Sequence, residues 1–131
     1  MYKHILVPVD LADVTASEKA LGAAKHAARR DGARITVITV VPAWPDEGSL
    51  APQDFEPEFN AYLDAVREDL DIDGIFRFGG SISGRIVEAV LDHEIDLVVM
   101  ASHNPRITDY LIGSNAAHVV LHCPCSVLVV R

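Results

Sequence analysis

The fold is decided by one stretch of the sequence: LVVM at residues 97–100, ASHNPRITDYLIGSNAA at 101–117 and HVVLHCPCSVLVV at 118–130. The first run is short and wholly apolar, which is typical of a parallel strand covered on both faces. Small and polar residues follow, and Gly113-Ser114 begins a helical pattern in which Ala116, Val119 and Val120 are expected to face inward. A second apolar run ends the stretch. This order predicts a strand, a polar loop, a helix and a final strand.

The rest of the chain alternates strands and helices in the same way. Apolar runs predict three further strands, at residues 5–10, 35–41 and 75–78, and the charge of Arg77 inside the last run indicates an edge strand. The segments between the strands have apolar residues at helical spacing, namely Ala20, Leu21, Ala24, Ala27 and Ala28, then Phe55, Phe59, Tyr62, Leu63, Val66 and Leu70, then Ile86, Val87, Val90 and Leu91. Five strands alternating with four helices in 131 residues predict a single α/β domain, residues 1–131, with an open parallel sheet.

Local signals mark the helix ends and one loop. Thr15-Ala16-Ser17-Glu18 has the pattern of a capping box, and Gly32 is expected to close the same helix in the left-handed conformation. Residues 42–52 contain three prolines and the only tryptophan, and predict a surface loop. Trp44 either covers the end of the sheet or packs over a ligand.

The composition argues against two classes of partner. The net charge of -8 argues against nucleic acid, because a phosphate backbone favours clustered Lys and Arg. No apolar run is long enough to insert across a membrane. The first residues enter a strand pattern without the features of a signal peptide, so a cytoplasmic protein is expected.

The two cysteines, Cys123 and Cys125, flank Pro124. In a reducing compartment such residues are most often small buried side chains, with redox chemistry as the alternative. A zinc site needs further ligands. His118 and His122 are near in sequence, but there is no second cysteine pair, so no metal site is predicted.

The pair Gly113-Ser114 has two interpretations. A helix start offers backbone N–H groups and a hydroxyl at the positive end of the helix dipole, which suits a phosphate group. Alternatively, Ser114 caps its own helix. The small residues Ala101 and Ser102, at the end of the preceding strand, leave room for a ligand to approach the backbone.

Two parts of the sequence resemble the universal stress protein family: MYKHILVPVD at residues 1–10, and ASHNPRITDYLIGSNAA at 101–117 followed by CSVLVVR at 125–131. The Ala-Ser-His-x-Pro loop and the Gly-Ser-Asn helix start resemble those of an adenine-nucleotide-binding subgroup. The resemblance covers the whole chain and is weaker from residue 42 to 71. It implies a Rossmann-like fold of the adenine nucleotide alpha hydrolase type, with strand order 3-2-1-4-5. It also implies ATP or AMP as the ligand, with Mg²⁺ on the phosphates of ATP.

The resemblance further implies which residues form the site. Pro8, Val9 and Asp10 line the adenosine pocket, where Asp10 accepts from the ribose or contacts adenine, while Val40 and Met100 press on the base. The phosphates lie between a loop and a helix start, comprising Ala101, Ser102, His103, Asn104, Gly113, Ser114, Asn115 and Ala116. Arg106 is a candidate phosphate clamp by its charge. Two alternatives are that Asp10 caps the next turn and that His103 is a hydrogen-bonded loop histidine.

The implied strand order gives a second reason to look at the same place. The first and fourth strands become neighbours whose connections leave toward opposite faces of the sheet. Open sheets bind ligands in the crevice at such a switch point. Val9, Asp10, Met100 and Ala101 are expected to converge there.

The sequence contains no Walker loop, no Gly-x-Ser-x-Gly elbow and no convincing nucleophile beside a base, so no catalytic residue is predicted. We therefore expect an adenine-nucleotide-binding stress or regulatory protein. One alternative is a dimeric interaction module that binds no nucleotide, favoured by Ala101 and Asn104 at positions where nucleotide-binding members of the family carry glycine. Another is a slow Mg²⁺-dependent ATPase that acts as a timer for a partner.

The last apolar run, Ser126–Val130, is predicted to lie at the edge of the sheet. An unprotected edge strand favours pairing with another chain. The family commonly dimerises through this strand, so a homodimer is expected.

Overall fold

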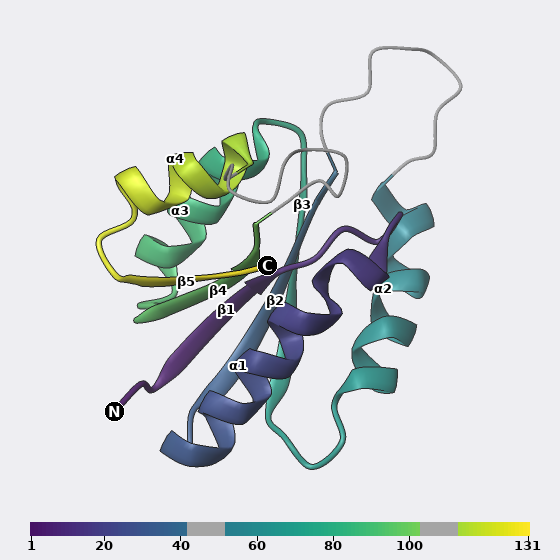
Figure 1. Ribbon diagram of the computed structural model, residues 1–131. Coiled ribbons are helices and arrows are strands. Elements are labelled where there is room, and N and C mark those ends of the chain that lie inside the picture. Colours follow the sequence, from purple (N-terminus) through teal and green to yellow (C-terminus); the bar gives the residue numbers. More distant parts are fainter. Residues whose placement is uncertain (42–51, 103–112) are drawn as a thin grey trace.

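Among residues 1–41, 52–102 and 113–131, which the computed structural model describes, five strands form one parallel sheet (Figure 1). The strands are β1 (His4–Pro8), β2 (Arg34–Val41), β3 (Ile72–Phe78), β4 (Leu97–Ala101) and β5 (Ser126–Val130). Their order is β3-β2-β1-β4-β5, and all neighbours are parallel. The predicted fold class and strand order are therefore confirmed.

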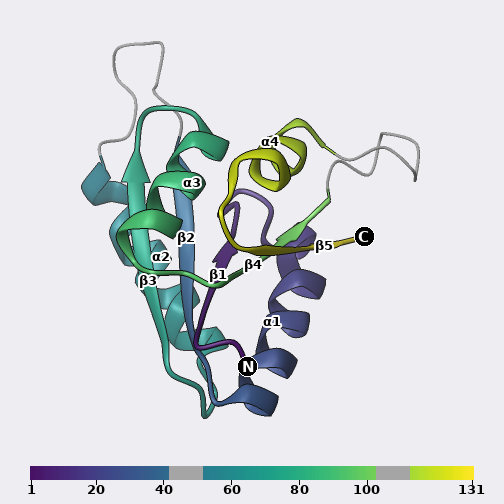
Figure 2. The same cartoon turned by 90° about the vertical axis from the view of Figure 1, so that its left-hand side faces the viewer.

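Helices cover both faces of this sheet (Figures 1 and 2). The helices α1 (Glu18–Asp31) and α2 (Pro52–Val66) pack on one face, and α3 (Ile82–Asp92) and α4 (Ser114–His122) pack on the other. Side chains of one strand alternate between the two layers, so that Ile5 and Val7 of β1 join the first core and Leu6 joins the second. Among the described residues, no helix is long and apolar enough to cross a membrane.

Several local expectations were wrong. The capping box at residues 15–18 does not form, because residues 14–17 make a short 3₁₀ helix, η1 (Val14–Ser17), and the Ser17 hydroxyl donates to the Val14 carbonyl at 3.1 Å. Two apolar side chains expected to face inward are exposed, Leu91 at 64% and Val120 at 45%. The strand predicted at 75–78 begins three residues earlier, at Ile72.

Other expectations are confirmed. The alanine face of α1 is buried, Gly32 ends the helix with φ of 69°, and β3 with Arg77 lies at the edge of the sheet. The surface loop was predicted at residues 42–52. Its last residue, Pro52, is the first residue of α2, and its other residues, including Trp44, lie outside the described residues.

Packing of α2 on the sheet edge requires a glycine at position 74. A Cβ atom there would come within 2.5 Å of Leu63 and 2.8 Å of Phe59, both buried side chains of α2. The missing side chain thus lets the helix lie directly on β3.

The two central strands separate as they approach their carboxyl ends. β1 pairs with β2 over five residues, but with β4 only at Ile5–Leu97 and Leu6–Val98. The chain after β1 leads into η1 and α1 on one face, and α4 follows β4 on the other. A crevice therefore opens between Pro8 and Ala101, at the switch point.

At the opposite end of the sheet, a chain of polar side chains joins three strands. Nδ1 of His4 donates to the carbonyl of His93 at 3.0 Å, and Nε2 lies 2.6 Å from Oγ1 of Thr36. The Thr36 hydroxyl donates to Asp73 at 2.5 Å. His4 and Thr36 are both buried, so Oγ1 of Thr36 is the polar neighbour of Nε2 in a place that water reaches poorly.

We predict that Thr36→Val destabilises the protein by roughly 1–3 kcal/mol, because the His4 ring loses a buried partner. Urea unfolding followed by circular dichroism measures the change. Thr15→Val is the matched control: its exposed hydroxyl donates to Asp13, and the expected change is within about 0.5 kcal/mol. Equal stability of the Thr36 variant and the unchanged protein would contradict the prediction.

Candidate functional site

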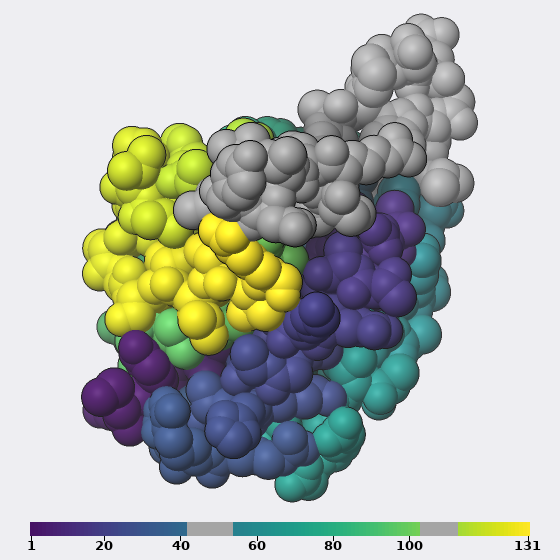
Figure 3. Space-filling model, in the orientation of Figure 1, coloured from purple at the N-terminus to yellow at the C-terminus, as the bar shows by residue number. Residues whose placement is uncertain are grey.

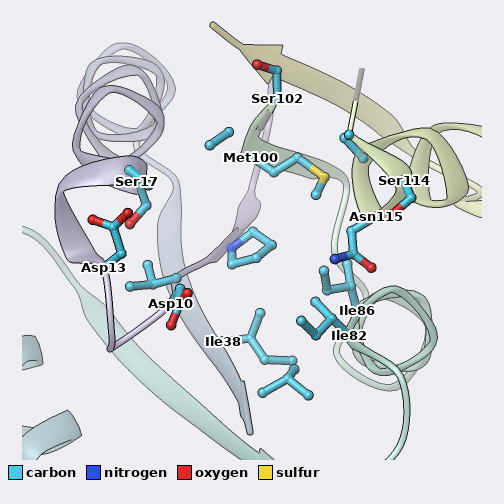
Figure 4. Close-up of a pocket in the computed structure, with 17 residues that line it drawn as sticks. Asp10, Asp13, Ser17, Ile38, Ile82, Ile86, Met100, Ser102, Ser114 and Asn115 are labelled. Atoms are coloured by element: carbon cyan, nitrogen blue, oxygen red, sulfur yellow. The ribbon is translucent and has the colours of Figure 1, made fainter. Parts of the chain in front are cut away.

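The crevice between β1 and β4 widens into a cavity of about 580 Å³, within the range common for small-molecule sites (Figure 4). Its walls come from the ends of β1, β2 and β4, from η1 and from the starts of α3 and α4. The lining residues are Pro8, Val9, Asp10, Asp13, Ala16, Ser17, Ile38, Val40, Ile82, Ile86, Met100, Ala101, Ser102, Gly113, Ser114, Asn115 and Ala116.

One part of the cavity is apolar. Ile38 and Ile86 are buried completely, Met100 is nearly so, and Ile82 lies beside Ile86 on α3 (Figure 4). Val40, at the end of β2, adds a further apolar side chain. Such a surface favours a flat apolar group, such as the face of a heterocyclic base, over a charged one.

A second part is acidic. Asp10 follows β1 and Asp13 precedes η1, and both lie on the side of the cavity opposite α4 (Figure 4). Oδ1 of Asp10 accepts the N–H of Ala12 at 2.9 Å, so the turn-capping role considered for this residue is present. Asp10 nevertheless remains exposed and lines the cavity, and its carboxylate can also accept hydrogen bonds from ligand hydroxyls.

The third part is the start of α4. The N–H of Gly113 donates to the carbonyl of Ser102 at 2.7 Å, which fastens the helix start to the end of β4. The first intrahelical bond runs from the N–H of Ala117 to the carbonyl of Gly113, at 2.9 Å. Helix geometry thus leaves the N–H groups of Ser114, Asn115 and Ala116 without acceptors inside the helix, at the positive end of its dipole. Gly113 has no side chain to cap the helix, and N–H groups at a helix start suit an anion.

The structure brings together every described residue that the sequence placed at the site. Pro8, Val9, Asp10, Val40, Met100, Ala101, Ser102, Gly113, Ser114, Asn115 and Ala116 all line the one cavity. His103, Asn104 and Arg106 lie outside the described residues.

Six lining residues were missed by sequence reasoning: Asp13, Ala16, Ser17, Ile38, Ile82 and Ile86. The capping-box interpretation placed Ser17 inside a helix start, whereas the 3₁₀ turn brings Asp13 and Ser17 to the crevice. Ile86 was expected in the core and lies there, but it also lines the cavity, together with Ile82 one turn earlier on α3. The one available signal was the position of Gly79-Gly80-Ser81, which leads from the carboxyl end of β3 into α3 at this edge of the sheet.

The sequence as a whole matches the universal stress protein family over residues 1–131. The chain belongs to this family. It is 31% identical over 147 aligned residues to universal stress protein G of Salmonella typhimurium, and the match covers all of both chains. The predicted family membership is therefore confirmed.

Solved universal stress proteins have the same fold. One, solved in complex with cAMP, is 22% identical, with a TM-score of 0.72 over 99% of this chain and 97% of the other. Another, from Archaeoglobus fulgidus and solved in complex with dAMP, is 21% identical, with a TM-score of 0.68 over 99% and 98% of the two chains. At these identities the likeness establishes the fold.

The cysteines of this universal stress protein lie beyond the cavity lining, between α4 and β5. Both are free and half-buried, and they pack against the core under α3 and α4. Burial raises the pKa of the Cys123 thiol. Burial, together with the neighbouring Cys123, raises the pKa of Cys125 to about 12. The two cysteines are packed side chains, as predicted, but they are half-buried rather than fully buried.

Because these thiols stay protonated near neutral pH, we predict slow modification. At pH 8, dithio-bis-nitrobenzoate should react with both thiols of the native protein more slowly than with free cysteine, and Cys125 should be the slower of the two. Unfolding in guanidinium is the control and should restore the rate of a free thiol. A native rate equal to that of free cysteine would contradict the raised pKa values of the two thiols.

Proposed function

We propose that this universal stress protein binds an adenine nucleotide, ATP or AMP, in the cavity at the ends of β1 and β4, and acts as a stress-response or regulatory protein. One observation carries the proposal: the cavity is polarised, with an apolar part, a carboxylate wall and a helix start that faces the carboxylates. These three surfaces match the three parts of a nucleotide, which are a base, a hydroxylated sugar and an anion. The relatives solved with cAMP and dAMP support adenine as the base.

The chemistry of each wall favours one orientation of the nucleotide in the cavity. The base lies against Val40 and Met100, the ribose hydroxyls donate to Asp10, and the phosphate accepts from the N–H groups of Ser114, Asn115 and Ala116. The reverse orientation would place phosphate beside two carboxylates, Asp10 and Asp13, where like charges repel. The cavity thus favours one direction of binding.

Asp10 and Asp13 also support a ligand that carries a Mg²⁺ ion. Carboxylate oxygens are ligands that Mg²⁺ accepts, so they fit an ion carried on the phosphates of ATP. We propose binding as the activity, because no histidine, lysine or cysteine lies among the described lining residues to activate a serine.

We predict that AMP raises the melting temperature of the protein and that Ser114→Asp abolishes most of this effect. At a hundredfold excess over Kd, a ligand adds about 2.7 kcal/mol, which is a few degrees for a domain of this size. An acidic side chain in the first turn stabilises the helix itself but repels phosphate, so weaker binding cannot be ascribed to unfolding. Titration calorimetry should show AMP affinity reduced roughly tenfold or more, with adenosine affinity little changed.

Asn60→Asp is the matched control, since Asn60 is exposed on α2 and the substitution adds the same charge away from the cavity. It should leave AMP binding unchanged. If neither AMP nor ATP with Mg²⁺ binds at millimolar concentration, the protein is instead an interaction module without a nucleotide. Phosphate release from ATP that Ser114→Ala abolishes would identify an ATPase.

We also propose that two copies pair through β5. This strand lies at the edge of the sheet, its Leu128 is 45% exposed, and Val127 and Val129 are half-buried (Figure 3, yellow). An apolar edge with unpaired backbone groups is the surface on which another strand can add. A second copy of the same strand can satisfy both the hydrogen bonds and the apolar contacts.

Leu128→Lys should therefore shift the protein from dimer to monomer in light scattering at micromolar concentration, because it places a charge in the paired edge. Leu91→Lys is the control, since Leu91 is 64% exposed on α3, and it should leave the mass unchanged. A monomeric mass for the unchanged protein would exclude this interface.

A further inference from the structure

We propose that α4 carries a metal site outside the nucleotide cavity, in which His118 and His122 together chelate one divalent transition-metal ion of the zinc class. The two residues are one helical turn apart and both are exposed. Their ring centroids lie 4.3 Å apart, with 42° between the ring planes. The helix thus holds two imidazoles side by side at the surface.

The spacing of the rings fits a shared ion. Zinc binds an imidazole nitrogen at about 2.0–2.1 Å, so two rings on one ion have centroids roughly 4.5 Å apart in octahedral geometry and roughly 5.2 Å apart in tetrahedral geometry. The observed 4.3 Å is close to the octahedral spacing and shorter than the tetrahedral one. The i, i+4 spacing is the one by which helical histidines bind zinc in metal enzymes.

The chemistry of the pair selects the metal. Neutral imidazole suits zinc, copper and nickel, whereas magnesium and calcium prefer oxygen ligands. Among the described residues, no group of three or more His, Cys, Asp or Glu side chains is arranged to hold an ion. The two histidines therefore supply two ligands and water supplies the rest, which makes this an open, exchangeable site.

The neighbouring thiols do not complete the site. Cys123 follows His122 directly, but it packs toward the core under α3 and α4, away from the solvent where the two rings lie. The ligands are thus the imidazoles alone.

The site is independent of the proposed nucleotide site but lies on the same helix. Ser114, Asn115 and Ala116 line the cavity, and His118 and His122 do not. An ion that bridges residues four apart stabilises the helical conformation, because the unfolded chain does not hold the two rings together. Metal binding at this pair therefore strengthens the helix whose first turn lines the cavity.

The test uses full-length protein without a histidine tag. Titration with zinc chloride, by calorimetry and by thermal unfolding, should show one ion per chain and a rise in melting temperature. His118→Gln or His122→Gln should each weaken zinc binding at least about tenfold, since a single imidazole remains. Imidazole ¹⁵N shifts in NMR should move for these two residues first, and magnesium should have no effect.

His26→Gln is the matched control, because His26 is an exposed histidine of another helix, α1. It should bind zinc as the unchanged protein does. The proposal is overturned if the double variant His118→Gln, His122→Gln, with an unchanged circular dichroism spectrum, keeps the zinc affinity. It is also overturned if Cys123→Ser, rather than the histidine variants, removes binding.

Discussion

The separation of β1 from β4 is the constraint on which the rest of the structure depends. The two strands pair at only two positions, and beyond Leu6 and Val98 their chains leave for opposite layers of helices. A sheet whose neighbours stayed paired to their ends would offer no volume at this edge. Here the gap is bounded by η1 on one side and α4 on the other, so sequence segments about 100 residues apart meet around one cavity.

The distribution of charge in this cavity differs from the net charge of the chain. A chain with a net charge of -8 has no general positive field to attract a phosphate. Backbone donors at the start of α4 provide a local one, and the hydrogen bond from Gly113 to Ser102 fixes their direction relative to β4. The carboxylates of Asp10 and Asp13 on the opposite wall then give the cavity a direction rather than a uniform charge.

Much of this could be predicted from the sequence, because the underlying signals are local. Continuous apolar runs identified the buried strands, and the small residues Ala101 and Ser102 with Gly113-Ser114 indicated the edge of the sheet where the cavity lies. Helical periodicity gave wrong predictions of burial where tertiary packing decides which side chains are exposed. Val120 and Leu91 fit the spacing of an inward helical face, but both are exposed to solvent. The close approach of α2 to Gly74 was likewise invisible, because it depends on a contact between residues distant in sequence.

The contributions of Asp13 and Ser17 could not be foreseen for a related reason. Both depend on a 3₁₀ turn replacing the expected capping box, a choice that the local sequence leaves undetermined. The same limit applied to α4, where the sequence gives the spacing of His118 and His122 but only the fold leaves both rings exposed and in contact.

The most direct test of the central claim is an NMR titration that follows each backbone amide as AMP is added. If AMP binds as proposed, the largest shifts occur at the amides of Ser114, Asn115 and Ala116, with smaller ones after β1, and none at Thr36 and Asp73 at the far end of the sheet. Shifts absent from the start of α4, or centred on another face of the molecule, would contradict it.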